Sequence, residues 1–289
     1  MKINVVGASG QLGSKVVRSL LARGADPESV IASARSKVRV EGIEALGVEL
    51  RHADYDRPAT LRSAFAGTGV LLLIPSLAAV EPRIVQHCNA VEAAQDCGVR
   101  RVVLVSFRAA QTSSRFLIAP YLLYAESKVR LSGMDWTILR NGMYLDPLAD
   151  WAPALAAEGR LPYPVRHGRV AYVCRDDLAR ASAAACLQDG HEGQVYELTG
   201  RRAVSMPELA SALTAATGQP IAFTQVSEGE FGEICRADGV PEYITEVLTS
   251  MYRAVDAGEF ETVTDHVERL TGAPPEGVTE YLRRALRRG

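Results

Sequence analysis

The chain has 289 residues, of which 47% are apolar, and its 32 Lys and Arg against 34 Asp and Glu give a formal charge of −2. This length allows one large α/β domain, or such a domain with a smaller lobe. The balanced charge lacks the basic excess that usually accompanies nucleic-acid binding, so we expect no nucleic-acid partner.

The cysteines, histidines and apolar runs argue against further classes of protein. The five Cys and five His are dispersed without zinc-site spacing, so we expect no metal site and reduced thiols. The densest apolar run, residues 70–75, is far too short to span a bilayer. The first residues enter a strand-like segment without a targeting signal. These features favour a cytoplasmic protein that does not contact membranes.

Strand-like and helix-like segments alternate along the first half of the chain. Strands are expected at residues 2–8, 29–35, 48–55, 69–76, 99–106 and 134–141, and helices at 11–24, 40–47, 58–67, 81–98 and 120–133. Apolar strands that alternate with helices are typical of a parallel sheet covered on both faces. The predicted fold class is therefore α/β, with a doubly wound parallel sheet.

The alternation weakens after residue 145, where the sequence predicts mainly helices. Ser205 and Glu208 have the spacing of a capping box, and Ser227 and Glu230 repeat it. Short strands are expected at 193–200 and 221–226. We interpret residues 1–146 as a cofactor-binding domain. Residues 147–289 would form a smaller, mostly helical substrate-binding lobe over the carboxyl ends of the strands, with short segments returning to the main sheet.

Glycines at residues 7, 10 and 13 lie between the first strand and the first helix. Gly7 suits a tight turn, Gly10 allows the approach of a pyrophosphate, and Gly13 allows close packing of the helix on the strand. The phosphates would bind at the helix N-terminus, where free N–H groups and the helix dipole favour anions. The spacing is G-x-x-G-x-x-G instead of the more common G-x-G-x-x-G, and an ordinary glycine-rich turn is the alternative. The residues expected at the cofactor are Gly7, Ser9, Gly10, Gln11, Leu12 and Gly13.

The end of the second strand distinguishes between the two nicotinamide cofactors. An Asp or Glu at this place typically binds the ribose 2′-hydroxyl of NAD. This chain has Arg35, Ser36 and Lys37 there, and the two cationic groups would attract a 2′-phosphate. We therefore expect NADP(H), with solvated surface charges as the alternative. The ends of the next two strands add Asp54, Pro75 and Ser76 to the expected cofactor contacts.

Several stretches of the chain resemble the NmrA-like group of atypical short-chain dehydrogenases and reductases. They are VVGASGQLG at 5–13, ARSK at 34–37, VELRHADYDRPATLRSAFAG at 48–67, LLLIPS at 71–76, AVEAAQDCGVRRVVLVS at 90–106 and SGMDWTILRNGMY at 132–144. The likeness continues through 191–200 and 239–272, and it is strongest to the branch of bacterial NADPH-dependent quinone oxidoreductases and triphenylmethane reductases. The resemblance implies a Rossmann-type domain with bound NADP(H). It implies either reduction of a flat, conjugated small molecule or, as in NmrA itself, cofactor sensing without catalysis.

Tyr124 and Lys128 have the Tyr-x-x-x-Lys spacing with which short-chain dehydrogenases protonate a carbonyl, and they share one face of a predicted helix. The resemblance argues against this role. Relatives carry a Glu that matches Glu126, and their catalytic lysine and tyrosine, where present, would correspond to Leu122 and Ile118. Both of these residues are aliphatic, and Tyr124 lies about 200° around the helix from residue 122. A local shift of the helix would restore the pair, so both residues stay candidates.

Other candidate catalytic residues follow the fifth and sixth strands. Hydride transfer to a quinone or a delocalised cation depends on positioning and exclusion of water more than on a strong acid. Ser106 and Phe107 are expected at the cofactor, and Ser106, Asn141 and Tyr144 as catalytic helpers; capping and packing are the alternatives.

Our leading hypothesis is an NADPH-dependent reductase of a quinone or other conjugated carbonyl compound. The alternatives are a non-catalytic NADP(H) sensor and a non-redox enzyme on the same fold. The Ala- and Arg-rich composition suggests a high-GC bacterium, where such enzymes also act in secondary metabolism. The sequence leaves the oligomeric state open, including a homodimer.

Overall fold

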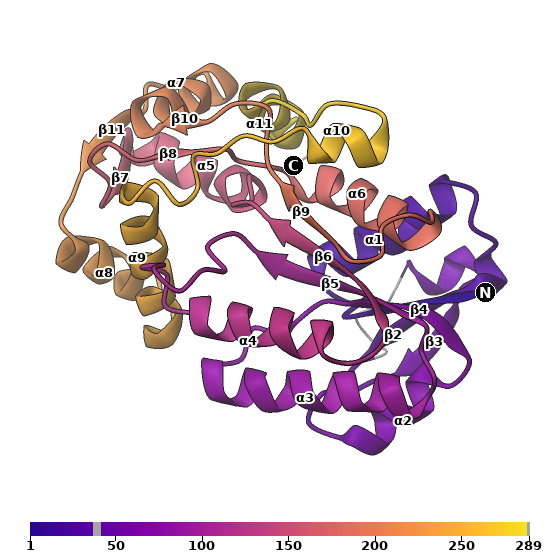
Figure 1. The fold of residues 1–289 in the computed structure, drawn as a ribbon. Coiled ribbons are helices and arrows are strands. Elements are labelled where there is room, and N and C mark those ends of the chain that lie inside the picture. Colours follow the sequence, from indigo (N-terminus) through magenta and orange to yellow (C-terminus); the bar gives the residue numbers. More distant parts are fainter. Residues whose placement is uncertain (37–41, 288–289) are drawn as a thin grey trace.

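The computed structural model describes residues 1–36 and 42–287 and has a seven-stranded parallel sheet at its centre (Figure 1). The strand order is β3-β2-β1-β4-β5-β6-β9. The strands are β1 (Lys2–Val6), β2 (Val30–Ala34), β3 (Glu49–His52), β4 (Thr68–Leu73), β5 (Arg101–Phe107), β6 (Asp135–Asn141) and β9 (Gln194–Leu198). The order of the first six is that of the Rossmann fold, which confirms the predicted α/β, doubly wound class.

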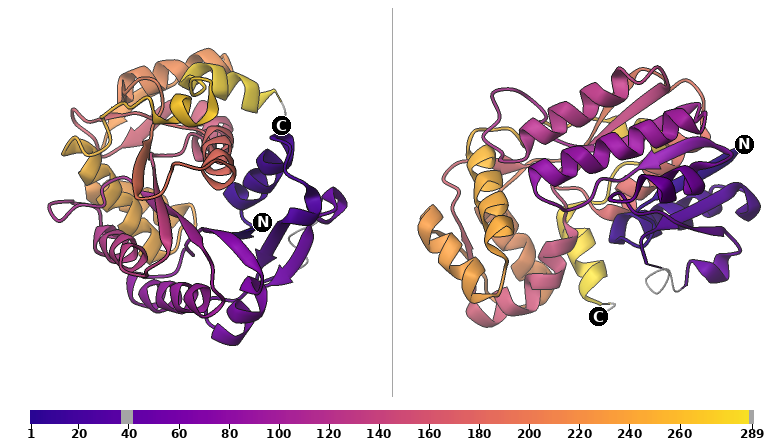
Figure 2. Two further views of the ribbon diagram at one scale, coloured as in Figure 1. Left: turned by 45° about the vertical axis from the view of Figure 1, so that its right-hand side comes forward. Right: turned by 90° about the horizontal axis from the view of Figure 1, so that it is seen from below.

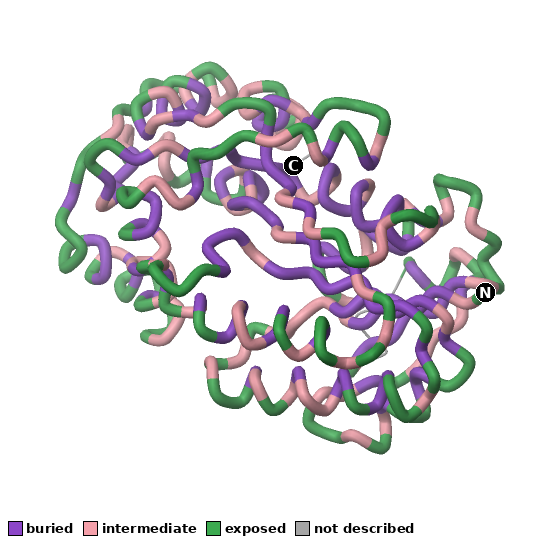
Figure 3. Tube along the Cα trace, in the orientation of Figure 1, coloured by how far each residue is buried: buried purple, intermediate pink, exposed green. Residues whose placement is uncertain are grey.

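Helices cover both faces of this sheet (Figure 1). One face carries α1 (Gln11–Ala22), α6 (Arg175–Leu187) and α10 (His266–Thr271), and the other carries α2 (Pro58–Phe65), α3 (Val80–Asp96) and α4 (Ala119–Arg130). Alternate residues of β4 supply the two cores, because Leu71 and Leu73 pack under α2–α4 while Val70 and Leu72 pack under α1 and α6. Figure 3 shows the strands as the buried centre of the molecule.

The segment before β3 differs from its prediction as a helix over 40–47. Its described part forms only a single 3-10 turn, η3 (Glu44–Leu46), and a second such turn, η1 (Pro27–Ser29), precedes β2. Gly42 and Gly47 have φ angles of +82° and +75°, in the left-handed region that ends or excludes an α-helix. The two glycines leave too few residues between them for helical hydrogen bonds to propagate.

The second half of the chain builds a lobe at the end of the molecule away from the N-terminus (Figure 2). It contains α5 (Asp146–Glu158), β7 (Arg160–Tyr163), β8 (Arg169–Val170), β10 (Val204–Ser205), α7 (Met206–Thr217), β11 (Ala222–Gln225), α8 (Glu228–Ala237), α9 (Glu242–Asp256) and α11 (Val278–Leu286). Strands β7 and β11 form a parallel pair, and β8 and β10 form an antiparallel pair. Ser205 and Glu208 make the predicted reciprocal capping box at the start of α7.

Part of the second half belongs to the main sheet. Strand β9 pairs with β6, and the buried face of α6 joins the core beneath α1. We propose a division into a cofactor-binding part, 1–146, and a substrate-binding part, 147–289, from which residues 175–198 return to the main sheet. Within residues 1–36 and 42–287, no helix is both long enough and apolar enough to cross a membrane.

Candidate active site

The glycine loop brings α1 into close contact with β1. Gly7 has a φ angle of +84°, which favours glycine. A Cβ atom on Gly13 would overlap the carbonyl oxygen of Gly7, so a side chain at residue 13 would push the helix away from the strand. Gly10 is exposed, and its Cβ would lie 3.2 Å from the same oxygen. The loop therefore keeps its outer side open to a ligand.

The N-terminus of α1 carries hydrogen-bond donors without helical partners. Gly10 is the N-cap and has no side chain to cap the helix, and the first helical hydrogen bond runs from the Ser14 N–H to the Gly10 oxygen at 3.0 Å. The amides of Gln11, Leu12 and Gly13 precede this bond and lie at the positive end of the helix dipole. Together with Ser9 in the loop, they fit the pyrophosphate of a dinucleotide at the point where the strand order reverses.

The predicted 2′-phosphate site follows β2. Arg35 is exposed directly after this strand, while Lys37 lies outside the described residues. Asp54, expected at the adenine, shapes the turn after β3: its Oδ1 accepts a hydrogen bond from the Asp56 N–H at 3.1 Å. Arg57 lies beside the same carboxylate, with 3.9 Å between its Nε and Oδ2 of Asp54.

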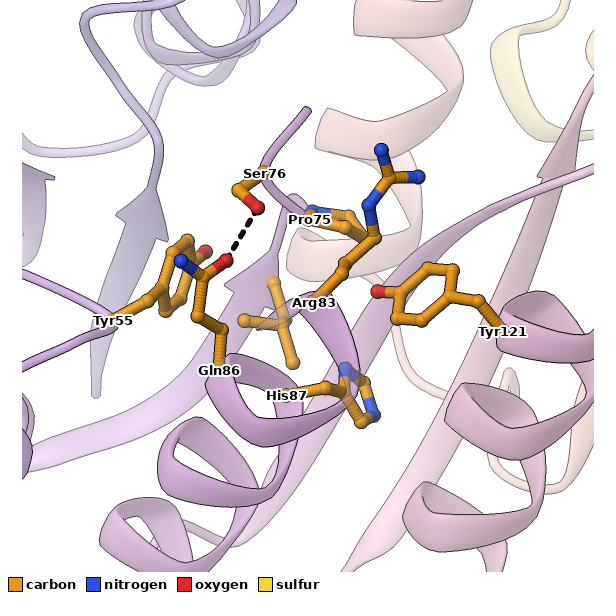
Figure 4. Close-up of a pocket in the computed structure, with 8 residues that line it drawn as sticks. Tyr55, Pro75, Ser76, Arg83, Gln86, His87 and Tyr121 are labelled. Atoms are coloured by element: carbon orange, nitrogen blue, oxygen red, sulfur yellow. Dashed lines mark hydrogen bonds between the residues drawn. The ribbon is translucent and has the colours of Figure 1, made fainter. Parts of the chain in front are cut away.

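Pro75 and Ser76 follow β4 and line a small cavity of about 10 Å³, shown in Figure 4. The Ser76 hydroxyl donates to Oε1 of Gln86 on α3, and the Tyr55 hydroxyl donates to the Ile74 oxygen at 2.6 Å. This volume is roughly that of one water molecule. The two hydrogen bonds fix the loop after β4 at the edge of the predicted cofactor site.

The ends of β5 and β6 bring four of the predicted residues together. Phe107 and Asn141 pair across the two strands, and Ser106 precedes Phe107. The Asn141 Nδ2 donates to the Tyr144 hydroxyl oxygen at 3.1 Å, and the Phe107 and Tyr144 rings pack edge to face with 6.0 Å between their centroids. Burial raises the pKa of Tyr144, so its phenol stays protonated at neutral pH.

Ser106 is held by a buried ion-pair network. Its hydroxyl donates to Oε1 of Glu126 at 2.8 Å, and the Glu126 side chain is only 1% exposed. Nε and Nη2 of Arg140 each donate to this carboxylate at 2.8 Å, and Arg130 lies 3.2 Å from it. In this network Arg140 of β6 compensates the buried charge of Glu126 on α4. The hydrogen bond to Glu126 gives Ser106 a structural partner.

An aromatic cavity of about 130 Å³ adjoins Phe107 and Tyr144. The rest of its lining is apolar or aromatic and, apart from Met143, comes from the lobe: Met143, Pro147, Leu148, Trp151, Tyr163, Tyr172, Leu248, Met251 and Tyr252. The Tyr163 and Tyr252 rings stack with 4.5 Å between their centroids. Flat, apolar molecules are the ligands that such a lining favours.

The structure places Tyr124 and Lys128 away from these four residues, against α3. The Tyr124 hydroxyl lies 2.7 Å from Sγ of Cys88, and Nζ of Lys128 lies 3.1 Å from Oε1 of Glu92. The hydrogen bond to Cys88, with some burial, raises the pKa of Tyr124 to about 12. Leu122, on another face of α4, is buried in the core.

Arg175 and most of the lining that the lobe contributes to the aromatic cavity are not identifiable from the sequence. The Arg175 guanidinium lies 5.0 Å from the centroid of the Tyr144 ring, and its Nη1 lies 3.6 Å from Oδ1 of Asp146. Arg175 begins α6, far from Tyr144 in the sequence, so no local spacing could reveal the contact. Trp151 lines the cavity and stays 45% exposed. Within the described chain, no cluster of three or more His, Cys, Asp or Glu side chains could hold a metal ion.

Comparisons with known proteins agree with this geometry. The profile of the NmrA-like family matches residues 1–282. Quinone oxidoreductase 2 of Escherichia coli (strain K12) is 32% identical over 280 residues, 97% of each chain. The NAD(P)H azoreductase of Xenophilus azovorans is 28% identical over 281 residues, 97% of this chain and 96% of that protein. The crystal structure of Citrobacter sp. triphenylmethane reductase with NADP(H) has a TM-score of 0.92 and 32% identity, and the match covers 99% of this chain and 100% of that one. The chain therefore belongs to the NmrA-like family, as its sequence motifs predicted.

Proposed function

We propose that this protein is an NADPH-dependent oxidoreductase that transfers a hydride to a quinone or another flat, conjugated carbonyl acceptor. The observation that carries the proposal is the aromatic cavity against Phe107 and Tyr144. It lies at the carboxyl ends of β5 and β6, on the side of the sheet where doubly wound folds bind their ligands. The named activities of the family members, on quinones, azo compounds and triphenylmethane dyes, all concern conjugated acceptors.

The residues of the site fit NADPH. The open N-terminus of α1 and the tight contact of Gly13 with Gly7 provide a cradle for the pyrophosphate. Arg35 provides a cation after β2, and no described residue of this strand end is acidic. NADPH, when bound, supplies the hydride.

Phe107, Tyr144 and the aromatic lining of the lobe would hold the acceptor and exclude water from it. The Tyr144 hydroxyl oxygen accepts a hydrogen bond from Asn141, which leaves the phenolic hydrogen free to donate. A protonated phenol beside the cavity can therefore donate to an acceptor oxygen as negative charge develops on it. Arg175, over the Tyr144 ring and paired with Asp146, would keep the ring in place.

A non-catalytic cofactor sensor does not need an acceptor cavity, so the cavity favours the reductase. The five cysteines are free thiols, as expected in the cytoplasm, where we propose that the enzyme acts. A role in secondary metabolism remains a proposal from composition and family resemblance.

The test is NADPH oxidation by the purified protein with a panel of quinones, azo dyes, triphenylmethane dyes and aromatic ketones. We expect turnover with at least one conjugated class, and a preference for NADPH over NADH. Micromolar NADPH binding without oxidation by any acceptor would contradict the proposal and favour the sensor. Tyr144→Phe should lower kcat by about tenfold or more while the Kd for NADPH stays within about twofold, because the change removes the proton donor and its hydrogen bond with Asn141 but no predicted cofactor contact.

A further inference from the structure

Arg83 is a buried cation without an anionic partner. It lies in the first turn of α3, and only 7% of it is exposed. Its Nε donates to the Ala78 oxygen at 2.8 Å, which leaves the two terminal nitrogens for other partners. None of the ion pairs within the described chain involves Arg83. Arginine is rarely buried without a carboxylate or a bound anion beside it.

Two phenols without hydrogen-bond partners accompany this guanidinium: Tyr121 contacts it, and Tyr243 is close enough to influence its charge. Tyr121 comes from α4 and is 1% exposed, and the Arg83 guanidinium carbon lies 5.0 Å from the centroid of its ring. Tyr243 comes from α9. Both hydroxyl oxygens are buried and have no partner in the described residues. Burial lowers the pKa of Arg83, and the nearby phenols Tyr121 and Tyr243 raise it in part. A buried hydroxyl that lacks a partner is destabilising, so a bound oxygen would be favourable here.

The surroundings of Arg83 indicate which ligand this oxygen belongs to. In Figure 4 the Arg83 guanidinium lies near Pro75, on the same side of the cavity as Ser76, and the Tyr121 hydroxyl points toward the Arg83 side chain. His87, below them, has its pKa lowered to about 4 by burial, so it adds no charge at neutral pH. The third side chain, Tyr243, belongs to α9, and the same helix lines the aromatic cavity with Leu248, Met251 and Tyr252.

We propose that Arg83, Tyr121 and Tyr243 form an anion-binding subsite that holds an acidic oxygen of the substrate, a carboxylate or a phenolate. Arg83 and Tyr121 line the small cavity after β4, and helix α9 connects Tyr243 to the aromatic cavity. This inference rests on the proposed function, because it takes the aromatic cavity as the acceptor site.

The phosphates of the cofactor are the other source of anionic oxygen. Pro75 and Ser76, which line the same small cavity as Arg83, are predicted cofactor contacts. We assign the oxygen to the substrate because the phosphates would bind at the α1 N-terminus and Arg35, whereas Tyr243 lies on α9.

Binding of unreactive ligands tests the subsite without turnover. The probes are 2-naphthoate and its neutral counterpart 2-naphthamide, titrated calorimetrically into the full-length protein saturated with NADP⁺. We expect the wild type to bind the carboxylate about tenfold more tightly, as one charge-assisted hydrogen-bonded pair would give. Arg83→Leu should reduce this ratio to about one, Arg83→Lys should retain part of it, and Tyr121→Phe and Tyr243→Phe should each lower it several-fold.

Arg62→Leu is the matched control, because it removes a guanidinium from the adjacent helix α2 whose side chain is 53% exposed and paired with Asp96. Its naphthoate-to-naphthamide ratio should equal that of the wild type. Thermal unfolding identifies variants that do not fold. If Arg83→Leu does not fold, the test relies on Arg83→Lys, which should retain part of the ratio. Equal affinity of the wild type for both ligands would overturn the subsite. So would an Arg83→Leu protein that keeps the ratio and binds NADP⁺ more weakly, since Arg83 would then hold the cofactor.

The outcome is separable from that of the proposed function. If the wild type oxidises NADPH with neutral quinones but shows no preference for the carboxylate, only the subsite proposal is contradicted. If it prefers the carboxylate but reduces no acceptor, only the reductase assignment is contradicted.

Discussion

At Gly13, the absence of a Cβ atom allows α1 to pack closely against β1. A Cβ atom there would overlap the Gly7 carbonyl oxygen, a backbone atom that cannot move aside as a flexible side chain can. We expect Gly13→Ala to cost about 1–3 kcal/mol of unfolding free energy, as overpacking does, and to weaken NADPH binding about tenfold or more. Gly10→Ala, with a Cβ contact of 3.2 Å, is the milder control for stability. Chemical denaturation measures the loss of stability and fluorescence titration the loss of NADPH affinity, and equal losses of stability in both variants would contradict the packing role of Gly13.

Tyr124 is the residue at which sequence spacing and tertiary contacts disagree. Its hydroxyl contacts Cys88 on α3, and its pKa of about 12 keeps it protonated at neutral pH. We therefore expect Tyr124→Phe to change kcat and the KM for NADPH by no more than about twofold, since the hydroxyl makes only a helix–helix contact. A collapse of kcat with intact NADPH binding would show that Tyr124 is catalytic after all.

At the scale of elements, His87 joins α3 to α4. Its Nε2 lies 3.1 Å from the Ala125 oxygen, and burial lowers its pKa to about 4. An unfolded histidine has a pKa near 6.5, so the unfolded state binds the proton first and stability falls as the pH drops from about 6.5 toward 4. We expect a loss of about 2 kcal/mol between pH 7 and pH 5, measured by urea denaturation.

The control for this pH effect is His87→Gln, which should remove most of the loss. The strongly paired carboxylates Glu49 and Glu208 have pKa values lowered to about 2, so their contributions are lost only at more acidic pH. An unchanged slope between pH 7 and pH 5 in His87→Gln would mean that another group titrates.

At the scale of the whole molecule, Arg108 connects the sheet to the lobe. It follows β5, its Nη1 lies 2.6 Å from Oε2 of Glu197 on β9, and its Nη2 donates to the Glu259 oxygen after α9. Its side chain is 9% exposed, so its contacts are largely shielded from solvent, while Glu197 also lies 3.4 Å from Arg140. We expect Arg108→Leu to destabilise the protein by about 3 kcal/mol and to raise the KM of the acceptor more than that of NADPH.

The matched control is Arg253→Leu, which breaks a pair with Glu228 whose side chains are 46% and 48% exposed. Solvent screens such a pair, and the cost should stay below about 1 kcal/mol. Similar losses of stability in the two variants would contradict the view that the buried contacts of Arg108 hold the lobe to the sheet.

Local signals in the sequence predict much of the fold. The strands and helices of the first half follow apolar periodicity, which is a pattern among residues close together in the sequence. The capping box that begins at Ser205 is also such a short pattern. The exception is the helix expected over 40–47, where two glycines with positive φ angles permit only a short turn. Helices α5 and α6 have no definite prediction from the sequence, because the alternation of strands and helices that identifies elements in the first half breaks down after residue 145.

The sequence by itself determined the family, the glycine loop and the α/β class, because each is encoded by residues close together in the chain. Only the tertiary structure could decide which side chains share the site. In the structure Tyr124 contacts α3 and Arg175 lies over the Tyr144 ring. The Arg83 guanidinium of α3 contacts the Tyr121 ring of α4, and Tyr243 of α9 lies close enough to affect its pKa. Such contacts depend on how helices pack against one another, and spacing along a single helix does not specify that packing.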